Sequence, residues 1–223
     1  MAADPSDIPR RLPRGSHGLD RNVVEASQRA RLLEAVGRAV ANRGYAAATI
    51  DDIVRGAGVS KKTFYEHFAD KEGCFLAAYE AAAEELFVRV REAHGTCGEW
   101  VDRTRAGIAA YLRWLAAEPA LARVFLIEVA AAGPRAAEAR ERLRDRYAVL
   151  MRDLQDEARA DIPALPRLPD EVFHAAVAAA DELVVRQIRE ATAEGLPELE
   201  PILLYLQVAL LAGPQVAAES AEL

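Results

Sequence analysis

The 223-residue chain is 52% hydrophobic, which makes it long enough to bury a core and too apolar to be disordered over most of its length. Aromatic residues make up only 6% of it while alanine and arginine are abundant, a composition that favours packed helices over sheets. The formal net charge of −7 excludes a protein that is basic throughout, so any contact with nucleic acid must come from a local basic patch.

Positive charge gathers in the first third of the chain. Residues 1–72 contain 12 lysines and arginines against 10 aspartates and glutamates, whereas the remaining residues are strongly acidic. All three lysines of the chain, Lys61, Lys62 and Lys71, lie within one short segment. A basic patch is therefore expected in that segment.

The cysteines and the N-terminal composition indicate the cellular compartment. Cys74 and Cys97 fit no metal or redox spacing, so both are interpreted as reduced packing residues. The first residues contain no apolar segment of the kind that a signal peptide or membrane anchor needs. We therefore expect a cytoplasmic protein with no membrane contact.

The first elements expected along the chain are an arm and a helix. Prolines and glycines with little apolar content predict a flexible arm over residues 1–24. From Ser27 apolar residues recur at helical spacing, and Gly44 is expected to end this helix in the left-handed conformation. The arginines of the arm, which fit either a contact with the DNA minor groove or a disordered basic tail, are Arg10, Arg11 and Arg14.

Residues 49–71 carry the strongest local signals. Thr49 and Asp52 are spaced as a capping box, which starts a short helix. Gly58 breaks that helix, and Ser60 is placed to cap a second one directly afterwards. Two short helices joined by a tight glycine turn form a helix-turn-helix, the motif whose second helix enters the major groove of DNA.

The second helix of this pair sorts its side chains onto two faces. Phe64 and Phe68 lie four residues apart and are expected to point into the core. The other side chains combine positive charge with hydroxyl, phenol and imidazole groups, which suit contacts with phosphates and base edges. Those left outside are Lys61, Lys62, Thr63, Tyr65 and His67.

The rest of the chain reads as a series of helices, so the predicted fold class is all-α. Asp70 and Asp170 are expected to cap the helices that they precede, and a proline-rich loop is expected over residues 162–169. The final helix is apolar on nearly every side, so a second subunit is expected to cover it. The helices are predicted at about residues 70–94, 98–117, 120–132, 135–160, 170–194 and 199–216.

Over about residues 27–76 the sequence resembles the tetracycline-repressor-like (TetR) transcriptional regulators. The resemblance rests on Gly44-Tyr45, Thr49-Ile50-Asp51-Asp52-Ile53, Ala57-Gly58-Val59-Ser60 and Thr63-Phe64-Tyr65-Glu66-His67-Phe68, followed by Lys71-Glu72. It implies a three-helix DNA-binding head, a linking fourth helix, a ligand cavity among the middle helices and a homodimer through the last two helices. By matching position it also implies a DNA-contacting set, which is Thr49, Ser60, Lys61, Lys62, Thr63, Tyr65, His67 and Lys71.

The expected organisation has three parts. They are a flexible N-terminal arm over residues 1–24, a helix-turn-helix DNA-binding domain over 25–72, and a helical ligand-binding and dimerisation domain over 73–218. Aromatic and polar side chains on the middle helices suit a mostly apolar ligand cavity, although each one alone is more typical of a packed core. These candidate ligand-binding residues are Trp100, Tyr111, Trp114, Phe125, Glu128 and Tyr147.

The sequence therefore predicts a ligand-responsive DNA-binding regulator, specifically a repressor that a small molecule releases from its operator. The alternatives are an all-helical enzyme, and an architectural or activating DNA-binding protein that takes no ligand. The chain has few histidines, no nucleophile–base pattern and no cofactor loop, so no catalytic residue, cofactor or metal is expected. The spacing Glu171-x-x-His174 matches one motif of di-iron bundles, but such sites need a second motif, so His174 is interpreted as structural.

Overall fold

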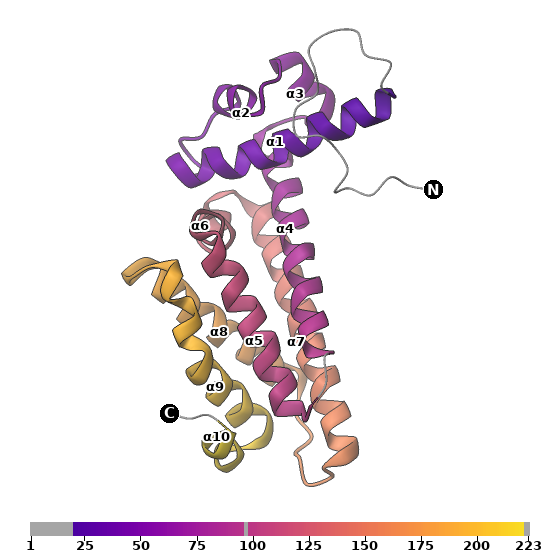
Figure 1. Cartoon of the computed structure of the whole chain (residues 1–223), viewed down its shortest axis with the longest axis vertical. Coiled ribbons are helices and arrows are strands. Elements are labelled where there is room, and N and C mark those ends of the chain that lie inside the picture. Colours follow the sequence, from indigo (N-terminus) through magenta and orange to yellow (C-terminus); the bar gives the residue numbers. More distant parts are fainter. Residues whose placement is uncertain (1–19, 96–97, 221–223) are drawn as a thin grey trace. The chain divides into compact units, whose positions relative to one another are not determined.

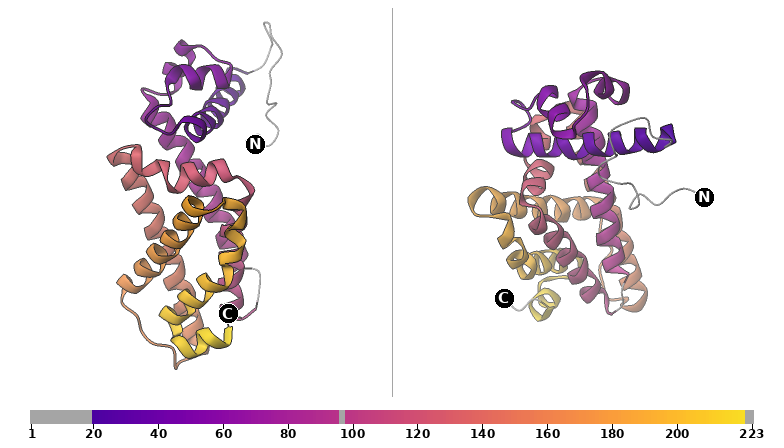
Figure 2. Two further views of the ribbon diagram at one scale, coloured as in Figure 1. Left: turned by 90° about the vertical axis from the view of Figure 1, so that its left-hand side faces the viewer. Right: turned by 45° about the horizontal axis from the view of Figure 1, so that its top comes forward.

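The computed structural model describes residues 20–95 and 98–220, and over these ranges the chain forms helices and no strand. The all-α prediction is therefore confirmed. The chain divides into two compact units, Met1–Tyr79 and Glu80–Leu223, with the division inside helix α4 (Lys71–His94). Figures 1 and 2 show the helices of each unit.

The first unit consists of three helices and the beginning of α4. The helices α1 (Arg21–Arg43), α2 (Ile50–Ala57) and α3 (Lys61–His67) contact one another in every pairing. Full burial of a large apolar side chain contributes roughly 1.5–3 kcal/mol, and this small unit depends on a few such side chains. Its fully or almost fully buried side chains include Leu32, Val36, Val40, Ile53, Phe64 and Phe75.

The predicted arm is wrong at its C-terminal end. Helix α1 begins at Arg21, so residues 21–24 are helical. The cause is Asp20, whose side chain accepts the N–H of Asn22 at 3.0 Å and caps the helix, so that it begins six residues before Ser27. The remainder of the predicted arm, with Arg10, Arg11 and Arg14, lies outside the described residues, as does Cys97.

The second unit is built from the rest of α4 and the following helices. Figure 1 shows α4, α5 and α7 running side by side, and ion pairs join Glu80 to Arg142 and Glu84 to Arg146 between α4 and α7. Helix α5 packs on α9, and α7 packs on α8. The α-helices are α5 (Trp100–Ala117), α6 (Pro119–Leu126), α7 (Pro134–Asp161), α8 (Asp170–Glu190), α9 (Glu200–Ala212) and α10 (Pro214–Ser220), with 3₁₀ segments at Glu128–Ala131 and Ala193–Leu199.

Several predicted helix ends need correction. Asp170 is the first residue of α8 and not its cap, which is Pro169. The final helix stops at Ala212 because Gly213 has φ 101° and Pro214 has no N–H with which to continue the hydrogen-bond ladder. The helix predicted over 120–132 ends at Leu126 and continues as a 3₁₀ turn. Asp70 does cap α4, since its carboxylate accepts the N–H of Gly73 at 2.6 Å.

The last residue of α4 is seated against a glycine of α5. His94 is buried, and its Nδ1 donates to the carbonyl oxygen of Val90 at 2.8 Å. Its ring occupies the space beside Gly107 where any other residue would place a Cβ. Arg103 Nε donates to the carbonyl oxygen of His94 at 2.8 Å, and burial lowers the pKa of the imidazole. The end of α4 is thus fixed to α5 by shape and by hydrogen bonds.

One face of α9 exposes apolar side chains. Ile202 and Leu210 are 38% and 37% exposed, and Leu206 lies between them at helical spacing on the same face. The opposite side of the helix is buried in its own unit through Leu203, Leu204, Val208 and Leu211. The segment Ala193–Ala212 is long and apolar enough to cross a membrane by length and composition alone. About a third of its most apolar stretch, 33%, is buried inside the protein.

Candidate nucleic-acid interface

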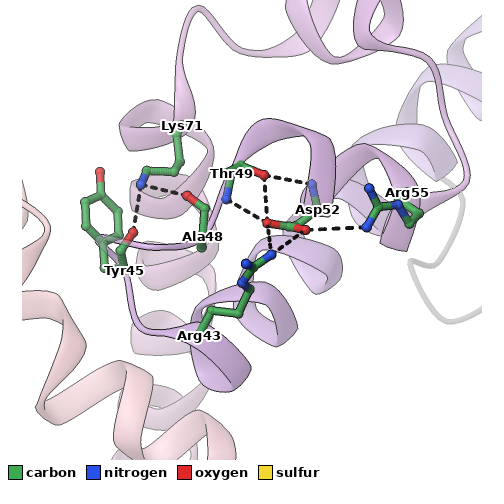
Figure 3. A network of polar contacts seen from close by, with 7 residues as sticks. All are labelled: Arg43, Tyr45, Ala48, Thr49, Asp52, Arg55 and Lys71. Atoms are coloured by element: carbon green, nitrogen blue, oxygen red, sulfur yellow. Dashed lines mark hydrogen bonds and ion pairs between the residues drawn. The ribbon is translucent and has the colours of Figure 1, made fainter.

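The start of α2 is held by the predicted capping box. The Thr49 hydroxyl accepts the N–H of Asp52 at 3.2 Å, and an Asp52 carboxylate oxygen accepts the N–H of Thr49 at 3.1 Å. Arg43, in the last turn of α1, donates to both oxygens of that carboxylate at 2.9 Å. The hydrogen bonds from Thr49, and secondarily the charge of Arg43, lower the pKa of Asp52. Figure 3 shows how these side chains fix the beginning of α2.

The turn between α2 and α3 is as short as the sequence predicts. Gly58 adopts the left-handed conformation with φ 64° and ψ 39°, where a Cβ would be strained, and its N–H donates to the carbonyl oxygen of Arg55. Arg31 of α1 donates to the carbonyl oxygen of Ala57 at 3.0 Å. The last carbonyl of α2, which cannot have a partner within its own helix, is therefore hydrogen-bonded by a side chain of another helix. The helix-turn-helix prediction is confirmed.

Helix α3 starts at Ser60 and directs two aromatic rings inward. The Ser60 hydroxyl accepts the N–H of Thr63 at 3.0 Å, which makes Ser60 the predicted cap. Phe64 is fully buried and Phe68 is 8% exposed, and their ring centroids lie 5.9 Å apart. These two side chains set the rotation of α3, so Tyr65 and Glu66 between them face away from the core.

Three of the predicted DNA-contacting side chains form an exposed tip, defined here as Lys61, Lys62 and Tyr65. Tyr65 is 56% exposed, and the lysine side chains are more than half exposed. Lys61 Nζ lies 2.7 Å from Asp51 of α2, which raises the pKa of the lysine, and Lys62 Nζ lies 3.8 Å from Glu66. Solvent-exposed ion pairs contribute little to stability, so a phosphate can replace either carboxylate at small cost.

The other predicted DNA-contacting residues are less exposed or already form hydrogen bonds within the protein. Thr63 and His67 are half-buried and not fully outside as predicted. The Thr63 hydroxyl lies 3.0 Å from that of Ser60, and His67 Nε2 lies 3.3 Å from Gln28 Oε1 of α1. Thr49 is exposed, but its hydroxyl also donates to Asp52 at 2.7 Å.

Lys71 differs most from the predicted picture, because its ammonium group points into the first unit. Lys71 Nζ donates to the carbonyl oxygens of Tyr45 and Ala48 at 2.7 and 2.9 Å and lies 4.3 Å from the centroid of the Tyr45 ring (Figure 3). Burial lowers the pKa of this lysine. One sequence signal was available, since a lysine in the first turn of a helix opposes the helix dipole and needs another reason to be there.

The turn that Lys71 contacts follows a glycine whose conformation the sequence did not predict. Gly44 has φ 76° and ψ 157°, which is a positive φ but not the expected left-handed helical conformation. The chain therefore leaves α1 in an extended direction before it returns toward α2. The N–H of Ala48 donates to the carbonyl oxygen of Gly44 at 3.1 Å and closes this turn.

The candidate ligand-binding residues fall into separate places in the second unit. Tyr147 of α7 lies edge-on to Tyr111 of α5 and to Phe87 of α4, with ring centroids 6.4 and 5.4 Å away. Phe87 was not predicted, although its position on a helix that faces α5 and α7 is the relevant signal. A second pair joins Trp114 and Phe125 at 5.8 Å.

The two remaining ligand candidates do not belong to the Phe87–Tyr111–Tyr147 cluster. Trp100 lies eleven residues before Tyr111 on α5, a separation of roughly 16 Å along a helix. Glu128 is paired with Arg123 at 3.6 Å. Among the described residues no group of three or more metal-ligating side chains is found, and His174 is paired with Asp145 at 3.6 Å.

Comparison with known proteins identifies the N-terminal region. Residues 32–78 match the family described as bacterial regulatory proteins, tetR family. The HTH-type transcriptional activator FasR of Mycolicibacterium smegmatis is 32% identical over 103 residues, which are 46% of this chain and 47% of that protein. The HTH-type transcriptional repressor KstR2 of Mycobacterium tuberculosis is 38% identical over 66 residues, 30% of this chain and 33% of that protein. The chain thus spans half or less of the length of these relatives.

Solved structures resemble a much larger share of the chain. The fatty acid degradation regulator FadR from Bacillus halodurans has a TM-score of 0.72 at 18% identity, covering 81% of this chain and 94% of that one. The regulator FadR from Bacillus subtilis, solved in complex with stearoyl-CoA, has a TM-score of 0.68 at 16% identity, covering 82% and 98%. At such identities the likeness shows the fold alone. The family match and the helix-turn-helix geometry agree: residues 32–78 are similar to the tetR family of bacterial regulatory proteins, and this region contains a helix-turn-helix.

Proposed function

We propose that this protein is a DNA-binding transcriptional regulator whose exposed tip contacts an operator. The observation that carries the proposal is the tip itself: Lys61, Lys62 and Tyr65 project from the second helix of a helix-turn-helix whose other face is fixed by Phe64. Thr49, Ser60, Thr63 and His67 border the tip and complete the proposed contact surface. As a chromosome-binding protein it would act in the cytoplasm.

Binding of duplex DNA should weaken with salt and should depend on Lys62. For Lys62→Ala we expect roughly tenfold weaker binding at 0.1 M salt, and a slope of log K against log salt that is smaller by about 0.9, because one phosphate contact is lost. The probe is a duplex selected from a random library with the wild-type protein, and the measurement is fluorescence anisotropy over a salt series.

Arg89→Ala provides the matched control for this substitution. It removes the same charge from an exposed ion pair, Arg89–Glu85, in the second unit. We expect it to bind the selected duplex like the wild type. A wild-type protein that selects no duplex, or equal effects of the two substitutions, would contradict the proposed function.

The proposed effector is an amphipathic small molecule that binds beside the aromatic side chains of α4, α5 and α7. The aromatic cluster of Phe87, Tyr111 and Tyr147 supports this class of ligand, and so does the likeness in fold to a regulator solved with stearoyl-CoA. Release requires that the effector bind the DNA-free conformation more tightly than the DNA-bound one. Addition of stearoyl-CoA to the anisotropy assay tests the class directly.

We propose repression as the sign of regulation, with activation as the second candidate. KstR2 is a repressor and FasR an activator, so the relatives include both outcomes. Repression needs only that the bound protein exclude polymerase from a promoter. A reporter gene behind the selected duplex distinguishes the two, because a repressor lowers and an activator raises its expression.

The proposed assembly is a homodimer through α8 and α9. The apolar stripe of Ile202, Leu206 and Leu210 supports it: Ile202 and Leu210 are exposed, Leu206 between them is half-buried, and contiguous apolar side chains at a surface mark interaction sites. A membrane is a poorer cover for this stripe, because the other side of α9 is already packed inside its own unit.

Charge placed on the stripe should separate the subunits. For the double substitution of Ile202→Glu and Leu210→Glu we expect a monomer in sedimentation equilibrium at concentrations where the wild type is a dimer, because each carboxylate loses its hydration in the interface. Val149→Glu, at a 43% exposed position of α7, is the control and should remain dimeric. A monomeric wild type would show that the interface does not exist.

A further inference from the structure

We propose that Lys71 is a positioning residue for the DNA-binding surface, because it binds the turn before α2 to the first turn of α4. The inference rests on the proposed function and changes the role given to this lysine, which the sequence comparison alone places among the DNA contacts. The contacts that carry it are the two hydrogen bonds from Nζ to the carbonyl oxygens of Tyr45 and Ala48. We call these three residues, together with Phe75, the α4 clamp.

The Lys71 ammonium group makes a third contact in the clamp. Besides the two hydrogen bonds, Nζ lies 4.3 Å from the centroid of the Tyr45 ring, which is a cation–π contact. The same ring packs edge-on against Phe75, one turn further along α4, at 5.0 Å. Lys71 and Phe75 therefore contact the turn from one face of α4. Lys71 makes a polar contact and Phe75 an apolar contact with the same residue, Tyr45.

The carbonyl of Ala48 is a group that needs such a donor. Ala48 is 2% exposed, and a buried carbonyl oxygen without a partner is costly. Because the donor is charged, each hydrogen bond is stronger than one between neutral groups. Lys71 has no carboxylate within ion-pair distance among the described residues, so the two carbonyls and the ring are its principal stabilising contacts there.

The position of the clamp explains how α4 would act on the proposed interface. Ala48 directly precedes Thr49, the cap of α2, so the start of α2 is held by Arg43 from α1 and by Lys71 from α4 (Figure 3). A displacement of the first turn of α4 moves the carbonyl of Ala48, and with it the residues that begin α2. Lys71 would thus affect DNA binding by setting where α2 and α3 lie, without needing a phosphate contact.

Lys71→Met tests this role against direct phosphate contact, with Lys62→Met as the matched control. For Lys71→Met we expect about tenfold weaker binding of the selected duplex, an unchanged salt slope, and faster amide hydrogen exchange over residues 44–52. For Lys62→Met we expect a slope smaller by about 0.9 and unchanged exchange. Lys71→Arg, whose guanidinium can donate to both carbonyls, should restore most of the affinity.

Two results would overturn the inference. One is a smaller salt slope for Lys71→Met with exchange over residues 44–52 unchanged, which would make Lys71 a phosphate contact. The other is wild-type affinity and exchange in Lys71→Met. If that variant does not fold, Tyr45→Leu removes the ring but keeps the carbonyl, and should speed exchange in the same segment. If the wild type binds no duplex, the proposed function fails, while the exchange measurement still tests the clamp.

Discussion

Replacing Phe64 by alanine is expected to unfold the first unit and to abolish DNA binding. The Phe64 side chain is fully buried in a unit of three helices and the start of a fourth, and it contacts both Tyr65 and Phe68. A buried Phe→Ala substitution costs about 3–5 kcal/mol, while a whole domain is stable by only about 5–15 kcal/mol. Hydrogen exchange should show lost protection over α1, α2 and α3 and retained protection in α5 and α7.

Tyr65→Ala, at the next position in the chain, is the comparison for Phe64→Ala. Tyr65 follows Phe64 directly but is 56% exposed, so its removal should change the free energy of unfolding by no more than about 0.5 kcal/mol. It should nevertheless weaken DNA binding, since the phenol belongs to the exposed tip. Retained protection of α3 in Phe64→Ala, or equal loss of stability in the two variants, would show that α3 is not anchored in the way described.

Replacing Gly107 by alanine is expected to destabilise the second unit by about 2 kcal/mol. Alanine gains up to about 1 kcal/mol over glycine from helix propensity, but overpacking costs about 1–3 kcal/mol, and the overlap here is severe. The new Cβ would coincide with the His94 ring, which cannot move away cheaply because it is buried and bonded to Val90. Urea denaturation of wild type and variant measures the difference.

Two further variants isolate the cause. Gly37 lies on α1 with open space where a Cβ would point, so Gly37→Ala should stabilise its unit by about 0.5–1 kcal/mol. In the background of His94→Ala, the Gly107→Ala substitution should lose most of its cost because the ring is gone. A Gly107→Ala protein as stable as the wild type would mean that His94 does not occupy the space beside the glycine.

The sequence predicted those features of the head that depend on neighbouring residues. The capping box of Thr49 and Asp52, the turn at Gly58 and the inward direction of Phe64 each follow from signals a few residues apart. The role of Lys71 did not, because its partners lie 23 and 26 residues earlier in the chain. Its charge alone suggests a DNA contact, and only the fold shows where the ammonium group points.

Several features of the second unit were likewise not predictable from the sequence. Its helices were predictable from periodicity, but the break at Gly213 depends on backbone conformation, just as the early start of α1 in the first unit depends on the side chain of Asp20. The candidate ligand residues were selected for aromatic character on the middle helices. Whether residues of different helices meet depends on how the helices are rotated, and this is why the contact of Phe87 with Tyr147 was not predicted. The separation of Trp100 from Tyr111, by contrast, follows from their spacing on one helix.

Helix α4 has a clamp at its first residue and a seated histidine at its last. Helix α4 contains no proline, and its single glycine, Gly73, lies in the first turn, so neither residue type that commonly kinks a helix occurs in the rest of it. At 1.5 Å per residue the two ends are roughly 35 Å apart. Each unit therefore holds one end of α4, the first through the hydrogen bonds of Lys71 and the second through the packing of His94 beside Gly107.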